Sequence, residues 1–294
     1  MGKRKRVVKR DASHQDVDDD AGSGSATSTE GSPATEDDLL VKTVNQMPTR
    51  EFKEHYINDD MLNYDYSSGT TIKRNVTLQF KAAADLSKDE LSACFTLIEK
   101  TSRVDYEPSS FGWHPKRKRR EMAEEEMRYL LVRDPASDEE GAVVGFMSFM
   151  MTHDSTPSVP VLYIYEVHLE ERLRKSGLGS HLIKLAEDVA ATVGVEKVML
   201  TCFLSNERAL AFYRKRGYEK DACSPDDRET RRKVVKVDYV IMSKSVESAV
   251  SQHASSGAER GGSSLLGVIR GLTSKLAGDQ LRSGEDVAQM RGWV

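Results

Sequence analysis

The segment YIYEVHLEERLRKSGLGSHL, residues 163–182, decides the fold of this 294-residue chain. It begins with the alternating pattern of a strand, continues through a polar turn, and ends where Gly177 and Gly179 open a helix-patterned stretch. The first amides of a helix lack acceptors within the helix, and the helix dipole adds partial positive charge there. Glycines let a phosphate approach the backbone, and Arg174 and Lys175 add charge. The segment therefore predicts a phosphate site, although a lone Gly-x-Gly also occurs in ordinary tight turns.

The sequence on either side of this segment predicts a mixed α/β sheet with helices on both faces. The loop with Gly177 and Gly179 lacks the Gly-Lys-Ser/Thr of a P-loop. It also lacks the three-glycine turn that follows the first strand of dinucleotide-binding proteins. Apolar periodicity predicts strands over 76–80, 129–132, 143–151, 161–169, 197–203 and 235–242. The same periodicity predicts a helix that begins at Ser87, one over 178–193 that ends at Gly194, and one that begins at Ser205 and ends at Gly217. A short helix is also expected within 40–60.

A second motif follows the predicted strand at 197–203. It reads Ser205-Asn206-x-x-Ala209-x-x-Phe212-Tyr213-x-x-x-Gly217-Tyr218. Together the two motifs resemble the GCN5-related N-acetyltransferase (GNAT) superfamily, over residues 75–245. The resemblance implies one GNAT-type domain that uses acetyl-CoA as co-substrate and no metal. It also implies a set of cofactor-binding residues: Val167, His168 and Leu169 through their backbone, then Arg174, Lys175, Ser176, Gly177, Leu178, Gly179, Ser180, Asn206 and Tyr213.

Further matches narrow the resemblance to one kind of N-terminal acetyltransferase. They are Tyr163-x-Tyr165-Glu166-Val167-x-Leu169-Glu170, KVMLT at 197–201, Tyr106-Glu107-x-Ser109-x-Phe111-Gly112-Trp113 and Arg119-x-Glu121-Met122. Over residues 50–245 the chain resembles the N-alpha-acetyltransferases that modify the N-terminal serine of histone H4 and histone 2A. The resemblance implies these histone tails as partners and the nucleus and cytoplasm as location. Phe111 stands where that family has Trp. The phenylalanine keeps an aromatic wall at this position but lacks the indole N–H donor.

The expected reaction sets demands on the catalytic side chains. Acetyl transfer requires a neutral amine, a thioester held in line and a stabilised oxyanion. An α-amino group has a pKa near 8, against about 10.4 for lysine, so a modest base, acting directly or through water, suffices. Glu166 is the first candidate base, with pairing to a basic side chain as its alternative role. Asp154 is the second, as base or as a substrate-holding group, and Tyr165 completes the catalytic candidates.

The expected substrate site is aromatic. Tyr163 and Tyr165 are two residues apart and share one strand face, where they line a peptide channel or pack a half-buried surface. His168 has the opposite strand parity, so we expect its side chain to be exposed and noncatalytic. Cys202 is expected in the core, because no base lies near it in the sequence. The resemblance implies substrate-binding roles for Tyr106, Phe111, Trp113, Tyr163 and Tyr239.

Composition sets the domain boundaries. Only 38% of residues are hydrophobic and 31% are charged, which predicts that part of the chain is disordered. We expect a disordered tail with a basic head at 1–40, the acetyltransferase domain at 41–245, and a low-complexity, disordered tail at 246–294. A net charge of −4 excludes a simple polybasic nucleic-acid binder, so we expect no direct DNA binding beyond contacts of the basic head.

Other features bear on location and partners. No apolar run reaches the length of a membrane span, and three widely spaced cysteines match no metal or disulfide pattern, so we expect no membrane contact and a reducing compartment. The basic run at 116–120 fits the start of a charge-paired helix, a localisation signal or a contact with an acidic partner.

Two rival functions stay open at this point. The acceptor could be a lysine or another protein N-terminus, and the chain could be a non-catalytic acetyl-CoA-binding chromatin adaptor. The intact loop at 174–179, together with Glu166 and Tyr165, argues against the adaptor.

Overall fold

The computed structural model describes residues 35–67, 73–135, 137, 141–154, 159–229, 231 and 234–247. The expected tails therefore fall mostly outside the described residues, and so does the basic head. Among the helices of the described residues, none combines the length and the apolar character that a membrane crossing requires.

A mixed sheet forms the centre of the described chain and confirms the predicted fold class. Its strands run in the order β1-β2-β3-β4-β5-β6-β10-β7, and a separate two-stranded ribbon pairs β8 with β9. Neighbours in the large sheet are antiparallel except β5 and β6, which are parallel. The bounds are β1 Asn63–Ser67, β2 Lys73–Ala82, β3 Arg128–Arg133, β4 Val143–His153, β5 Pro160–Leu169, β6 Lys197–Phe203, β7 Glu219–Lys220, β8 Arg228–Glu229, β9 Val234–Val235 and β10 Tyr239–Ser245.

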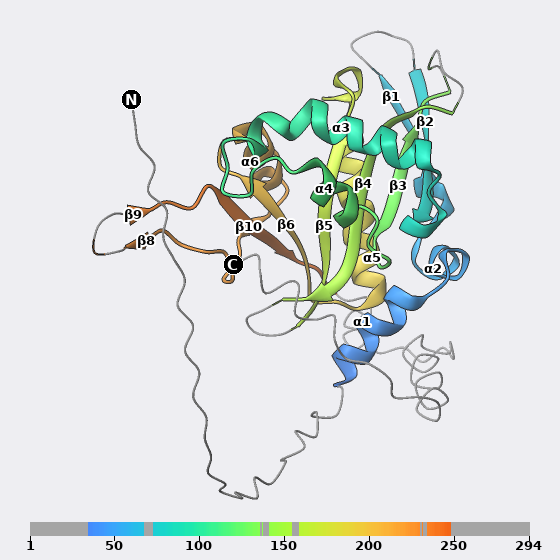
Figure 1. The fold of residues 1–294 in the computed structure, drawn as a ribbon. Helices are drawn as coiled ribbons and strands as arrows, with labels where there is room; N and C mark the ends of the chain where they lie inside the picture. The colour runs from blue at the N-terminus through green and yellow to red at the C-terminus, as the bar shows by residue number, and fades with distance from the viewer. Residues whose placement is uncertain are drawn as a thin grey trace, which may run out of the picture. The chain divides into compact units, whose positions relative to one another are not determined.

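The parallel pair of strands is short. β5 and β6 pair only from Val161 with Lys197 to Ile164 with Leu200, although both strands continue beyond that point. They diverge toward their carboxyl ends, as Figure 1 shows. β6 stays paired with β10 along its whole length, whereas the second half of β5 pairs only with β4. The later residues of β5 therefore offer a strand edge with no strand on its β6 side.

Helices cover both faces of the sheet, as predicted. α3 and α4 cross one face, and α5 runs along the other with α1 and α2 (Figure 1). α6 follows β6 and packs Leu210 into the same core as α5. The bounds are α1 Glu36–Gln46, α2 Thr49–Tyr56, α3 Lys88–Tyr106, α4 Pro115–Glu121, α5 Leu178–Val193 and α6 Glu207–Lys215.

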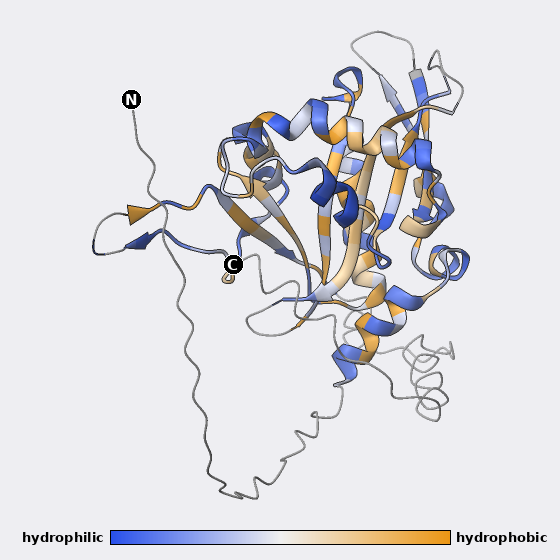
Figure 2. Ribbon diagram, viewed as in Figure 1, coloured by the Kyte–Doolittle hydropathy of each residue, from blue (hydrophilic) through white to orange (hydrophobic). Residues whose placement is uncertain are grey.

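Each face of the sheet has its own hydrophobic core. The larger core joins α1, α2, α5 and α6 to the sheet through residues such as Val44, Phe52 and Leu182. The smaller core joins α3 to β3 and β4 through residues such as Ile98 and Phe146. Figure 2 shows apolar residues along the central strands, whereas α4, which lies over the second face, is almost wholly hydrophilic.

Several elements differ from the sequence prediction. α1 begins at Glu36, inside the stretch expected to be a tail, because Thr35 and Asp38 form a reciprocal capping box. The cap of α6 is Asn206 and not Ser205, since the Asn206 side chain accepts the Ala209 N–H at 3.1 Å. The predicted strand at 235–242 is broken, and β10 begins only at Tyr239.

We predict that Gly145 is required for the end of β5 to pack. A Cβ at this position of β4 would lie 2.6 Å from the Leu169 side chain and 2.9 Å from the His168 carbonyl oxygen. Gly145→Ala should therefore lower the free energy of unfolding by about 1–3 kcal/mol, measured by chemical denaturation. Gly179→Ala is the control: its Cβ meets only ordinary contacts from 3.7 Å, so its effect should stay within about 1 kcal/mol. Equal stability of the two variants would contradict the close packing of β4 on β5.

Candidate active site

A β-bulge in β5 arranges the central residues of the site. Ser148 pairs with Glu166 and the next residue of β4, Phe149, pairs with Ile164, so Tyr165 is an extra residue in β5. Such a bulge breaks the strict alternation of side chains along a strand. Tyr163 and Tyr165 lie on the face covered by α3, with ring centroids 5.3 Å apart. Glu166 points to this same face, because it reaches side chains from α3 and α4.

His168 shows the consequence of the bulge most clearly. The expectation that its side chain is exposed is wrong: it is 6% exposed, and its Nε2 lies 2.5 Å from Glu166 Oε2. Its Nδ1 lies 2.5 Å from Thr101 Oγ1 on α3. The parity argument failed because the extra residue at Tyr165 returns Glu166 and His168 to the face that Tyr163 occupies.

Glu166 is a buried carboxylate with three side-chain partners. Its Oε1 lies 2.8 Å from Lys118 Nζ and accepts a longer hydrogen bond from the Tyr106 hydroxyl at 3.3 Å, and its Oε2 lies against His168. Burial favours the neutral acid, but Lys118 and His168 outweigh burial and hold the pKa of Glu166 well below its ordinary value, at about 2. A carboxylate with so low a pKa is a weak proton acceptor near neutral pH. The geometry therefore favours the ion-paired role of Glu166 over the base role.

Asp154 lies at the other end of β5. Its backbone N–H donates to the Val159 carbonyl just before the strand begins. Glu166 is six positions after Pro160, which corresponds to about 20 Å of strand. The structure therefore does not bring Asp154 and Glu166 together, and the two carboxylates cannot act on the same amine proton.

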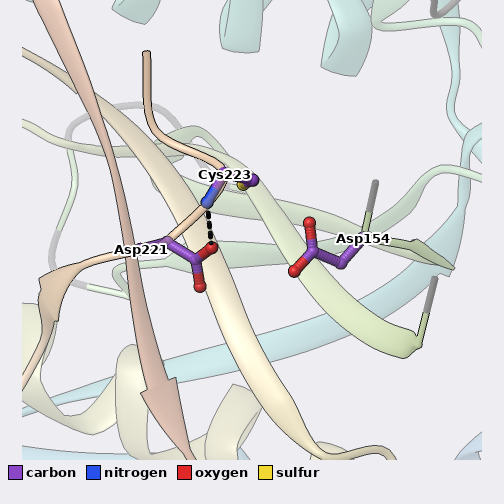
Figure 3. A group of neighbouring side chains, drawn as sticks. All are labelled: Asp154, Asp221 and Cys223. Atoms are coloured by element: carbon purple, nitrogen blue, oxygen red, sulfur yellow. Dashed lines mark hydrogen bonds between the residues drawn. The ribbon is translucent and has the colours of Figure 1, made fainter. Parts of the chain in front are cut away.

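Asp154 belongs to a group with Asp221, which is buried as well, and Cys223, which is half-buried (Figure 3). The Cys223 backbone N–H donates to Asp221 at 2.9 Å, and ligand atoms of all three residues lie within 4.8 Å of one another, close enough to hold a cation. The Lys197 ammonium already contacts both carboxylates, at 2.7 Å for Asp221. Burial and the two carboxylates raise the pKa of the Cys223 thiol to about 12, so it stays protonated near neutral pH.

The structure gathers most of the aromatic substrate candidates into one wall. Tyr106 at the end of α3 contacts Trp113, and Phe111 contacts Tyr239 on β10, with centroid distances of 5.6 and 4.9 Å. Phe203 of β6, which the sequence analysis did not single out, joins the two pairs at 4.8 Å from Tyr106 and 5.7 Å from Phe111.

Tyr163 lies beside this wall and links it to the acidic group. Its hydroxyl lies 2.5 Å from Thr201 Oγ1 on β6. Burial raises the pKa of Tyr163, and Cys223, Tyr239 and Asp154 act on it in the same direction. Tyr163 is therefore within electrostatic reach of Tyr239 in the aromatic wall and of Asp154 and Cys223.

The predicted phosphate site lies where β5 leads into α5. Gly177 has a φ of +91° and precedes the helix, and Lys175 has a φ of +62°. The N-cap residue Gly177 has no capping side chain, and the neutral Ser176 hydroxyl accepts the Leu178 N–H at 3.3 Å. The first turn carries no acidic residue, so no carboxylate neutralises its partial positive charge. The Tyr64 hydroxyl donates to the Ser176 carbonyl at 3.1 Å, and a Cβ on Gly177 would lie 2.4 Å from that hydroxyl. Tyr64 thus holds the loop in place, a role that the sequence did not indicate.

The strand edge beside this loop presents backbone amides. The Glu170 N–H donates to the Val144 carbonyl, toward β4. Because amide directions alternate along an antiparallel strand, the amides of Val167 and Leu169 point away from β4, toward the side where β6 has diverged. The Leu169 carbonyl accepts from Arg174 Nε at 3.3 Å. Val167, Leu169 and the loop therefore form one continuous backbone surface.

Two residues expected to bind the cofactor, Asn206 and Tyr213, belong to the start and the body of α6. Asn206 caps α6 and also donates to Asp105 of α3 at 3.4 Å. Tyr213 is half-buried against the larger core, and burial raises the pKa of its hydroxyl. The Phe212 ring lies 3.7 Å from the position of a Cβ on Gly179, which brings α6 beside the glycine loop. Cys202 packs in the larger core, as expected.

Sequence analysis missed three of the charged and polar residues of the site. Lys118 is hidden within a run of basic residues, Thr101 belongs to no motif, and Glu121 stands in the Arg119-x-Glu121-Met122 match without a role assigned to it. One signal exists for Lys118: it lies four residues before the buried Met122, on the same side of the helical turn.

Known proteins resemble this chain in sequence. Residues 90–218 match the acetyltransferase (GNAT) family. N-alpha-acetyltransferase 40 of Saccharomyces cerevisiae is 29% identical over 60% of this chain and 68% of its own length. The uncharacterized protein YxbD of Bacillus subtilis is 30% identical over 29% of this chain and 57% of its own length. Arabidopsis thaliana NAA60, solved with a bisubstrate analogue, aligns with 59% of this chain and all of its own, at 12% identity and a TM-score of 0.44. Residues 90–218 thus match the acetyltransferase (GNAT) family, and the chain is similar in sequence to N-alpha-acetyltransferase 40.

Proposed function

We propose that the chain transfers acetyl from acetyl-CoA to the N-terminal serine amine of histone H4 and histone 2A. The observation that carries the proposal is the continuous backbone surface from Val167 and Leu169 to the amides at the start of α5. The family match and the similarity to N-alpha-acetyltransferase 40 support acetyl transfer to a protein N-terminus. The choice of histone tails rests on the motif resemblance described above.

The residues present fit acetyl-CoA. The first turn of α5, with its glycines and without acidic side chains, suits the pyrophosphate. The outward amides of Val167 and Leu169 suit the amide-bearing pantetheine arm. When bound there, the thioester supplies the acetyl group, and the Tyr106 and Glu166 side chains lie on the adjacent face of β5.

An α-amine suits this site better than a lysine. With a pKa near 8, about one tenth of an α-amine is neutral at pH 7, against less than one in a thousand for a lysine amine. The ion-paired Glu166 offers little base strength, so we propose that the proton leaves through water. A substrate that needs little help to lose its proton is therefore favoured.

The rest of the site suits a basic peptide tail. Among the described residues, two carboxylates, Asp154 and Asp221, contact one ammonium, that of Lys197, within electrostatic reach of Tyr163. We propose that Asp154 attracts basic residues that follow the terminal serine and does not serve as the base. The aromatic wall of Tyr106, Phe111 and Tyr239 would flank the peptide. Action on histones is consistent with location in the nucleus and cytoplasm, which we propose on the same resemblance.

The cofactor assignment predicts that Gly179→Val weakens acetyl-CoA binding about tenfold or more, because a branched side chain in the first turn blocks close approach to the amides. Isothermal titration calorimetry measures the affinity. The control is thermal unfolding of the same variant, which shows whether the added side chain disturbs the fold beside Phe212 and Leu169. Unchanged affinity in the folded variant would contradict the phosphate site.

The substrate assignment predicts that an H4 peptide beginning with free serine gains one acetyl group, on its α-amine. The same peptide with a blocked N-terminus and free lysines should stay unmodified, because its lysine amines are almost wholly protonated. Mass spectrometry with fragmentation locates the group. Acetyl groups on lysine would overturn the assignment, and equal rates for peptides beginning with other residues would overturn the preference for serine.

A further inference from the structure

Lys118 differs from every other member of the basic run at 116–120. Its side chain is only 9% exposed, whereas Lys116, Arg117, Arg119 and Arg120 are exposed on the same short helix. A buried ammonium is costly unless charges and hydrogen bonds compensate it. The position of Lys118 therefore requires partners inside the site.

Those partners connect three elements around the bulge. Lys118 Nζ lies 2.8 Å from Glu166 Oε1 on β5, 2.6 Å from Glu121 Oε1 on α4, and 4.9 Å from the centre of the Tyr106 ring at the end of α3. The second oxygen of Glu166 contacts His168, whose other ring nitrogen contacts Thr101 of α3. A chain of polar contacts thus runs from α4 through β5 to α3.

The charges in this chain depend on one another. Burial alone would raise the pKa of Glu166 and lower that of Lys118. Their mutual attraction reverses both shifts, and Tyr106 and Glu121 further raise the pKa of Lys118. Glu121 is more exposed than Glu166, and burial raises its pKa despite Lys118, so Glu166 is the principal anion facing the ammonium.

We propose that Lys118 is a positioning residue for acetyl transfer, which keeps the Glu166 carboxylate ionised and fixed at the bulge beside the acetyl-transfer surface. In this role Glu166 meets the substrate as a fixed anion, and Lys118 acts only through it. The inference rests on the proposed acetyltransferase function for its kinetic consequences, whereas the state of Glu166 itself depends on the fold alone.

The electrostatic part is tested by a carbon-13 NMR titration of the Glu166 carboxyl, which needs no substrate. Lys118→Met keeps a similar length and removes the charge, so the Glu166 titration midpoint should rise by about two pH units or more, as burial becomes the dominant influence. Lys118→Arg should keep it low. Lys116→Met, an exposed neighbour on α4, is the matched control and should leave it unchanged. An unchanged midpoint in Lys118→Met would overturn the proposal.

The kinetic part uses acetylation of a peptide with a free N-terminus. Lys118→Met should lower kcat about tenfold or more and leave the acetyl-CoA Kd within about twofold. On acidification, the variant should lose its activity at a higher pH than the unmodified protein does. Lys118→Arg should recover most of kcat. If Lys118 acts only through Glu166, Lys118→Met added to Glu166→Gln should cost nothing further, and a strictly additive loss would contradict this.

These experiments distinguish failure of the proposed function from failure of the Lys118–Glu166 coupling. Absence of peptide acetylation by the unmodified protein would refute the proposed function, while the NMR titration would still decide the Lys118–Glu166 coupling. Lys118→Met leaves a buried carboxylate unpaired, so it can fail to fold. In that case the charge-free pair Lys118→Met with Glu166→Gln carries the test: activity equal to that of Glu166→Gln alone supports the proposal, and lower activity overturns it.

Discussion

The extra residue in β5 is the constraint on which the rest of the site depends. Without the bulge at Tyr165, strict alternation would send Glu166 and His168 to the face of α5 and away from α3 and α4. Directly before the bulge the pairing with β6 ends, at Ile164 with Leu200. One local irregularity thus coincides with two features of function: reactive side chains on one face, and a backbone edge without a strand partner.

The face that the bulge creates carries two separate groups of charge. At the carboxyl end of β5, Lys118 and His168 flank Glu166, and at the amino end Lys197 joins Asp154 and Asp221. In the first group the Lys118 ammonium contacts Glu166 and Glu121, and His168 is a further partner of Glu166. In the second the Lys197 ammonium contacts Asp154 and Asp221, and these carboxylates suit the basic peptide that we propose as substrate. The aromatic side chains of Tyr106, Phe111 and Tyr239 form the wall that we propose flanks the peptide.

Periodicity was sufficient for the strands β2 to β6, which have clear apolar patterns, and for α3 and α5, which also have clear capping residues such as Ser87 and Gly194. It did not predict the edge strands β1 and β7, which are short and mostly polar. The glycine loop was equally clear in the sequence. The burial of His168 was mispredicted because a bulge leaves no signature in hydrophobic alternation. Lys118 was missed because its partner lies 48 residues away and its helix is hydrophilic throughout. Contacts between distant polar residues depend on packing, which local pattern does not encode.

The backbone surface of β5 is the centre of this account, and amide hydrogen exchange with and without acetyl-CoA tests it most directly. Side-chain substitution at Val167 or Leu169 would leave the amides in place and test nothing. We predict that saturating acetyl-CoA slows exchange at both amides about tenfold or more, whereas the amides of Phe146 and His168, paired across β4 and β5, change little. Unchanged exchange at Val167 and Leu169 in protein saturated with acetyl-CoA would contradict the account.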